Sequence, residues 1–157
     1  MYFDFDNITR VLGALLTPII AIIATYIAWQ QWKTSYQKLN LDRYDRRLRI
    51  YEEVTKILVV IVREADASYE ELARFRVSVA EADFLFGPDI AEYVDEIYER
   101  GVRLHGWNEQ YRDGAQIKPA GYDHQKVVDE MHKELNWLLK QLETVIVKFN
   151  KYMSVSR

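Results

Sequence analysis

The sequence has no cysteine and contains little proline or glycine. The absence of cysteine excludes disulfide bonds, thiolate metal sites and a cysteine nucleophile. Three prolines and six glycines among 157 residues favour long helices, because these two residue types interrupt helices. Segments that alternate polar and apolar residues, as strands do, are also missing, so the pattern predicts an all-α fold.

The motifs that would mark an enzyme are absent as well. The chain has neither of the glycine-rich nucleotide-binding signatures and no G-x-S-x-G motif of an acyl-transfer serine. Its histidines, His105, His124 and His132, form no H-E-x-x-H zinc motif. Glu96 and Arg100 are four apart and predict an ordinary helix-surface pair. We therefore expect no catalytic residue, no metal site and no cofactor in a protein that is not an enzyme.

Positive charge is concentrated in one short segment. The net charge is −3, but residues 33–49 carry six Lys or Arg against two Asp, so the remainder is acidic. Nucleic-acid binding requires a clustered excess of Lys and Arg to neutralise phosphates. The acidic C-terminal part therefore predicts no nucleic-acid partner.

An apolar run occupies residues 11–29, VLGALLTPIIAIIATYIAW, and residues 11–32 carry no charge. As a helix it would be about 29 Å long, close to the roughly 30 Å of a bilayer's hydrocarbon core. Aromatic residues flank both ends, as in an interfacial belt. The run therefore predicts a single-pass transmembrane helix. The alternatives are a buried helix of a soluble core and a cleaved signal peptide, which would need a basic start.

The basic segment predicts the orientation of this helix, because Lys and Arg collect on the cytoplasmic side. Residues 1–10 would form a short extracytoplasmic tail, residues 11–32 the transmembrane helix with its interface, and residues 33–157 a cytoplasmic helical domain. The predicted location is the inner (cytoplasmic) membrane. The residues expected at the membrane interface are Tyr26, Trp29, Trp32, Lys33, Lys38, Arg43, Arg46 and Arg47.

Small residues recur along the apolar run. Gly13, Thr17 and Ala21 lie four apart, and such spacing lets helix backbones approach closely. We interpret these three as helix-association residues. The predicted partners are the lipid bilayer and either a second copy of the chain or another protein.

Four helical stretches follow the basic segment, and each has one apolar stripe. The first covers about residues 41–64, with no Pro or Gly between residues 19 and 87, so it can continue the preceding helix. The second begins at Ser68, which forms a capping box with Glu71. Gly87 and Pro88 separate it from the third, residues 88–112. Asp123 caps the fourth, which ends near residue 153.

Stripes spaced by three and four residues predict an antiparallel bundle of three to four helices with coiled-coil-like packing. We expect the first and fourth helices to pair. The stripes expected to be buried are Leu41, Tyr44, Leu48, Tyr51, Thr55, Leu58 and Val62; then Leu72, Phe75, Val79 and Phe86; then Ile90, Val94, Ile97, Gly101 and Leu104; and finally Val128, Met131, Leu135, Leu138, Leu142, Val145 and Phe149.

One aromatic and polar cluster does not fit the stripes. His105, Trp107, Tyr111 and Arg112 precede the loop at residues 114–122, and aromatic residues and arginine dominate binding at interfaces. We interpret the four as a partner-binding patch. The alternatives are that they cap the end of the bundle, or that they line a small-ligand site.

Two segments resemble signatures in small uncharacterised bacterial and phage single-pass membrane proteins. The juxtamembrane signature matches residues 38–47, KLNLDRYDRR, followed by Ile50, Tyr51 and Glu52. A second signature matches residues 84–90, FLFGPDI. The resemblance implies one N-terminal membrane helix, a cytoplasmic helical domain and an association with phage–host conflict. It brings no catalytic residues.

These observations predict a membrane-anchored, non-enzymatic interaction, scaffold or regulatory module. The alternative hypothesis is a membrane-perturbing, pore-forming effector whose anchors oligomerise.

Overall fold

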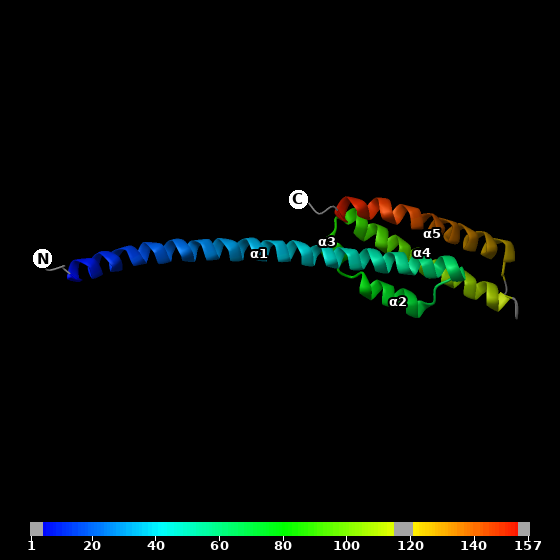
Figure 1. Ribbon diagram of the computed structural model, residues 1–157. Coiled ribbons are helices and arrows are strands. Elements are labelled where there is room, and N and C mark those ends of the chain that lie inside the picture. The colour runs from blue at the N-terminus through cyan, green and yellow to red at the C-terminus, as the bar shows by residue number, and fades with distance from the viewer. Residues whose placement is uncertain (1–4, 115–120, 154–157) are drawn as a thin grey trace. The chain divides into compact units, whose positions relative to one another are not determined.

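The computed structural model describes the backbone of residues 5–114 and 121–153, and the side chains of residues 16, 18–112 and 121–153. All regular elements within these residues are helices, which confirms the all-α prediction. They are α1 (Phe5–Glu64), α2 (Tyr69–Ser78), α3 (Ala82–Leu85), α4 (Pro88–Gly114) and α5 (His124–Met153) (Figure 1). The chain divides into two compact units, Met1–Asp42 and Arg43–Arg157, which are described separately.

The predicted transmembrane helix is wrong. Among the residues described, no helix includes a segment both long and apolar enough to cross a membrane. The described apolar side chains of this run end at Trp29. Gln30, Gln31 and Lys33 follow within about one turn. The single-pass inner-membrane location depended on this helix and is corrected with it.

In the first unit, α1 exposes large apolar side chains. Trp32 and Tyr36 stack with ring centroids 6.0 Å apart, and Lys33 Nζ lies 5.7 Å from the centre of the Trp29 ring. As the lack of Pro and Gly after residue 19 predicts, α1 continues without a break to Glu64. The exposed apolar residues are Leu16, Ile19, Ile20, Ile22, Ile23, Tyr26, Ile27, Trp29, Trp32, Tyr36, Leu39 and Leu41.

The second unit is a helical bundle around one core. It combines the C-terminal part of α1 with α2, α3, α4 and α5 (Figure 1). The α4 stripe is buried as predicted, and so are Leu72, Phe75, Val79 and Phe86. The remaining buried apolar residues are Ile50, Val54, Ile57, Leu58, Ile61, Ala67, Ala82, Tyr93, Val127, Leu138, Val145 and Phe149.

The predicted helix starts are confirmed by their capping contacts. Glu71 N donates to Ser68 Oγ at 3.3 Å, and Ser68 N donates to Glu71 Oε2 at 2.9 Å. The hydrogen bond from the Ser68 side chain lowers the pKa of Glu71. Lys126 N donates to Asp123 Oδ1 at 3.2 Å, so Asp123 caps α5. These starts were predictable because the capping residue and its partner are neighbours in the sequence.

The buried stripes of α1 and α5 differ from those predicted. In α1 the buried residues include Ile50, Val54 and Ile57, whereas most of the predicted stripe is half-buried or exposed. In α5, Glu134 and Gln141 occupy buried positions. The predicted α5 residues that are only half-buried are Val128, Met131, Leu135 and Leu142.

Candidate interaction surfaces

Two of the four predicted partner-binding residues contact the turn between α1 and α2. His105 Nδ1 lies 3.0 Å from Asp66 Oδ1, and Arg112 Nη2 donates to Asp66 Oδ2 at 3.1 Å. From the same face of α4, Asn108 Nδ2 donates to the carbonyl oxygen of Ala65 at 3.0 Å. His105 and Arg112 therefore both contact this turn, and their binding of a partner stays a prediction.

The turn needs these contacts because its backbone is unusual. Ala65 has a φ of 54°, a left-handed conformation that non-glycine residues adopt at a cost. Asp66 Oδ1 also accepts from Ala67 N at 2.9 Å. The Tyr69 ring meets the His105 ring edge-on, with centroids 4.4 Å apart. These contacts therefore join both the turn and α2 to α4.

The other two residues of the predicted patch remain more accessible. Trp107 is half-buried, and Tyr111 is exposed. The Tyr111 ring lies 5.5 Å from the His124 ring, and His124 Nδ1 lies 3.0 Å from the Tyr122 hydroxyl. This aromatic group links α4 to the start of α5, which agrees with the alternative that the cluster caps the bundle.

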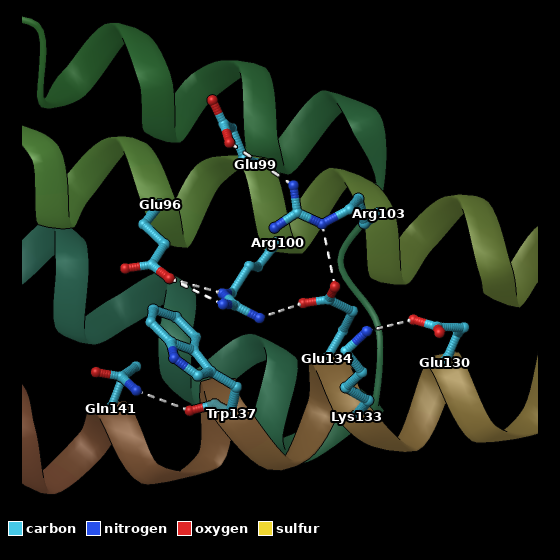
Figure 2. Close-up of polar contacts among 9 residues, drawn as sticks. All are labelled: Glu96, Glu99, Arg100, Arg103, Glu130, Lys133, Glu134, Trp137 and Gln141. Atoms are coloured by element: carbon cyan, nitrogen blue, oxygen red, sulfur yellow. Dashed lines mark hydrogen bonds and ion pairs between the residues drawn. The ribbon is translucent and has the colours of Figure 1, made fainter.

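A buried carboxylate joins α4 to α5, and the sequence did not reveal it. Glu134 Oε2 accepts from Arg100 Nη1 at 2.9 Å, and Glu134 Oε1 accepts from Arg103 Nε at 3.0 Å (Figure 2). The predicted pair of Glu96 and Arg100 is present at 2.9 Å. The Arg100 guanidinium also lies 4.2 Å from the centre of the Trp137 ring. Glu134 is therefore neutralised by two arginines of the neighbouring helix.

The electrostatics of this cluster suit a structural role. Burial lowers the pKa of Arg100, but hydrogen bonds to Glu96 and Glu134 outweigh burial and raise it overall. Each oxygen of Glu134 accepts a hydrogen bond from an arginine of α4. Within the part of the chain that is described, no group of His, Asp or Glu could hold a metal ion. The cluster locks α4 against α5.

The predicted membrane-interface residues fall into two groups. Arg47 is structural: its Nε donates to the Leu85 carbonyl at 2.9 Å, and its Nη1 donates to the Tyr152 carbonyl at 3.1 Å. Arg46 Nη1 lies 3.4 Å from Glu81 Oε2. Both arginines thus fasten α1 to other parts of the bundle. The other members of the set, all exposed, are Tyr26, Trp29, Trp32, Lys33, Lys38 and Arg43.

The predicted helix-association residues are largely outside the described side chains. This applies to Gly13 and Thr17, while Ala21 is exposed on α1. The small-residue stripe therefore stays a prediction.

A continuous apolar surface lies along α1 and α5 in the second unit. We call it the α1–α5 face. Its members are uncharged, spaced mostly by three or four residues on each helix, and either half-buried or exposed. They are Tyr44, Leu48, Tyr51, Thr55, Val59 and Val62 of α1, and Val128, Leu135, Leu139, Leu142, Ile146 and Met153 of α5.

α5 runs antiparallel to α1 (Figure 1) and packs mainly against α4, while individual side chains join it to α1. The Tyr51 ring meets the Phe149 ring edge-on at 5.6 Å, and Arg47 reaches the Tyr152 carbonyl. The opposite flank of each helix is occupied elsewhere: Glu53 of α1 contacts Ser78 of α2, and Trp137 of α5 contacts α4. The apolar flanks of α1 and α5 therefore converge on the same surface.

No protein-family model matches the chain, and no curated protein or solved structure was found to be significantly similar to it. The functional argument therefore depends on the chain's own surfaces.

Proposed function

We propose that the protein is a non-enzymatic interaction module that binds another polypeptide through the α1–α5 face. The observation that carries this proposal is the absence of charge from twelve half-buried or exposed positions along two adjoining helices. Val59, Leu139 and Ile146 expose 48%, 37% and 57% of their surface. Single exposed apolar residues are common on proteins, but a contiguous apolar patch is typical of a binding site.

The shape of the face favours a helical ligand. Two adjoining antiparallel helices present parallel rows of side chains, into which the apolar face of a further helix can pack. Such an interface would bury no charged group at its centre, so binding would not require the desolvation of a charge. Burial of the aliphatic side chains would contribute about 25 cal/mol per Å² of apolar area.

The pore-forming alternative has less support. It requires a helix that spans a membrane, and the described residues contain none that is long and apolar enough. We therefore develop only the interaction module.

The proposal can be tested by site-specific cross-linking, because the chain contains no cysteine of its own. Val59→Cys and Ile146→Cys would place a single thiol on the face, and Val77→Cys would place one on α2. Val77 is the matched control because it is a valine that is 78% exposed and lies outside the face. Each full-length variant would carry a thiol-reactive photo-cross-linker in an extract of the producing cells.

We expect defined adducts from the two face variants and none from Val77→Cys. Adducts with the mass of two chains, or of the chain plus a different protein, would both support an interaction module. If the face variants gave no adduct, or gave the same diffuse products as Val77→Cys, the α1–α5 face would not be a binding site.

A further inference from the structure

A row of exposed charges borders the α1–α5 face along the outer edge of α1. It consists of Asp45, Glu52, Lys56 and Arg63, spaced by seven, four and seven residues, so that all four lie on one side of the helix. The N-terminal half of the row is acidic and the C-terminal half is basic. The side chains of Lys56 and Arg63 are 71% and 69% exposed.

Because one half of the row is acidic and the other half basic, the row is complementary to the same row on a second, antiparallel α1. If a second α1 lies antiparallel with its centre near residue 54, Asp45 faces Arg63 of the partner subunit, and Glu52 faces Lys56 of the partner subunit. A parallel arrangement in register would instead place each charge against the same charge, which is destabilising. Arg49 would lie opposite Val59 and meet no like charge.

The same antiparallel superposition also matches the apolar flank of α1. It brings Tyr44 near Val62 of the partner subunit, Leu48 near its Val59, and Tyr51 near its Thr55. The apolar pairs are therefore symmetric about a point on α1 that lies within about one residue of the point about which the charge pairs are symmetric. A two-fold axis through this point would bring identical faces together, as in the closed interfaces of most homodimers.

We infer that the ligand of the α1–α5 face is a second copy of this chain, bound with the two α1 helices antiparallel. This inference rests on the proposed function and names the partner for the same surface. The apolar flanks of α1 and α5 supply the buried centre of the dimer. The charge row forms its rim and selects the antiparallel direction.

The first test reverses charges in the rim of the full-length protein. Self-association would be measured by sedimentation equilibrium in a mild non-ionic detergent, which keeps the exposed apolar residues 16–41 from associating. Glu52→Lys and Lys56→Glu should each weaken the homodimer on the order of tenfold, because every homodimer contains the affected pair twice. An equimolar mixture of the two variants should associate within about threefold of the unchanged protein.

The control for these variants is Glu70→Lys. Glu70 lies on α2 with its side chain 74% exposed, so its reversal makes the same change in net charge as Glu52→Lys, but away from the face. Glu70→Lys should leave the dimer constant unchanged. Circular dichroism would verify that every variant retains its helix content.

The second test reports the direction of the helices. Thr55→Cys lies near the proposed two-fold axis, so a short bismaleimide should join two copies. Val62→Cys should not be joined, because its two copies would be separated by about 25 Å along the helix axis. Efficient cross-linking of both variants would indicate parallel helices and overturn the inference.

The remaining outcomes separate this inference from the proposed function. A chain that stays monomeric at 100 µM, roughly the upper range of a laboratory measurement, would overturn the dimer. The interaction module would still stand if Val59→Cys and Ile146→Cys gave adducts with a different protein. If the charge reversals left the dissociation constant of the homodimer unchanged, the contact would lie elsewhere on the chain, and the inference would also be overturned.

Discussion

At the scale of single residues, Glu134 is the side chain on which the contact between α4 and α5 depends most. It is 4% exposed and neutralised by Arg100 and Arg103. Glu134→Gln keeps the shape but removes the carboxylate that the two arginines share, leaving Arg100 only Glu96 and Arg103 only Glu99. Removing one partner of a buried ion pair is strongly destabilising, so we expect a loss of about 2–3 kcal/mol in the free energy of unfolding, measured with urea.

The matched control for this change is Glu99→Gln. Glu99 also pairs with Arg103, at 3.6 Å, but its side chain is 66% exposed. Exposed ion pairs contribute little, so the expected loss is about 0.5 kcal/mol or less. Equal losses for the two variants would show that burial of Glu134 is not what makes its pairing important.

Ala65 offers a second prediction at this scale, with the opposite sign. Its φ of 54° strains any residue that has a Cβ atom. The strain that Ala65→Gly relieves in the folded state should exceed the cost of the added conformational entropy of the unfolded chain. We expect a gain of about 0.5 kcal/mol in thermal or urea unfolding. Ala73→Gly, at an exposed position inside α2, should cost about 1 kcal/mol. A loss at both positions would contradict the assigned strain.

Residue contacts could be predicted from the sequence only where the partners are close along the chain. Glu96 and Arg100 are one helical turn apart, and their pairing was expected. The contacts of Glu134 with Arg100 and of Asp66 with His105 join residues 34 and 39 positions apart. No local spacing indicates such partners, so His105 was interpreted as free to bind a partner.

At the scale of helices, the approach of α2 to α4 depends on Gly101. A Cβ atom at this position would lie 2.6 Å from Leu72 Cδ2, and Leu72 is 1% exposed and has little space to move. Gly101→Ala should therefore destabilise by about 1 kcal/mol or more, despite alanine's higher helix propensity.

Gly106 lies in the same helix and gives the matched comparison. No atom lies within 4 Å of a Cβ built on it, so Gly106→Ala should stabilise by about 0.5–1 kcal/mol. Opposite signs for the two variants in urea unfolding would confirm that α2 and α4 pack closely at Gly101. A gain at both positions would show that Leu72 can move aside.

Helix starts were predictable, whereas the buried side of α1 was not. Ser68 and Asp123 act through neighbouring backbone groups, so their sequence context is sufficient. In α1 two adjacent stripes are apolar, one through Val54 and one through Thr55, and spacing alone cannot decide which faces the core. The three-dimensional arrangement buries the first and leaves the second on the α1–α5 face.

At the scale of the whole molecule, an apolar stripe that has helix–helix spacing but is not buried within one chain is a candidate for a contact with another chain. The predicted stripe through Leu48, Tyr51 and Thr55 has coiled-coil spacing, yet it lies at the bundle surface. The pattern was therefore detected correctly, but it was assigned to the intramolecular core. The homodimer proposed above would account for this stripe as a contact between two chains.

Association through this face predicts that stability depends on protein concentration. If the dimer unfolds to two separate chains, its free energy of unfolding rises by about 1.4 kcal/mol per dimer for each tenfold increase in concentration. Ile146→Glu should abolish this dependence, because it places a charge at the centre of the face. Val147→Glu should not, because Val147 is 75% exposed and is not a member of the face.

The measurement is thermal unfolding by circular dichroism from about 1 to 100 µM, a range over which a dimer with a dissociation constant near 10 µM would shift its midpoint. The two glutamate variants occupy neighbouring positions on α5 and carry the same net charge, so charge alone cannot separate them. A midpoint that rises for the unchanged chain and for Val147→Glu, but stays constant for Ile146→Glu, would locate the association on the α1–α5 face. Unfolding midpoints that did not change with concentration for any of the three proteins would show that no second copy binds to the α1–α5 face.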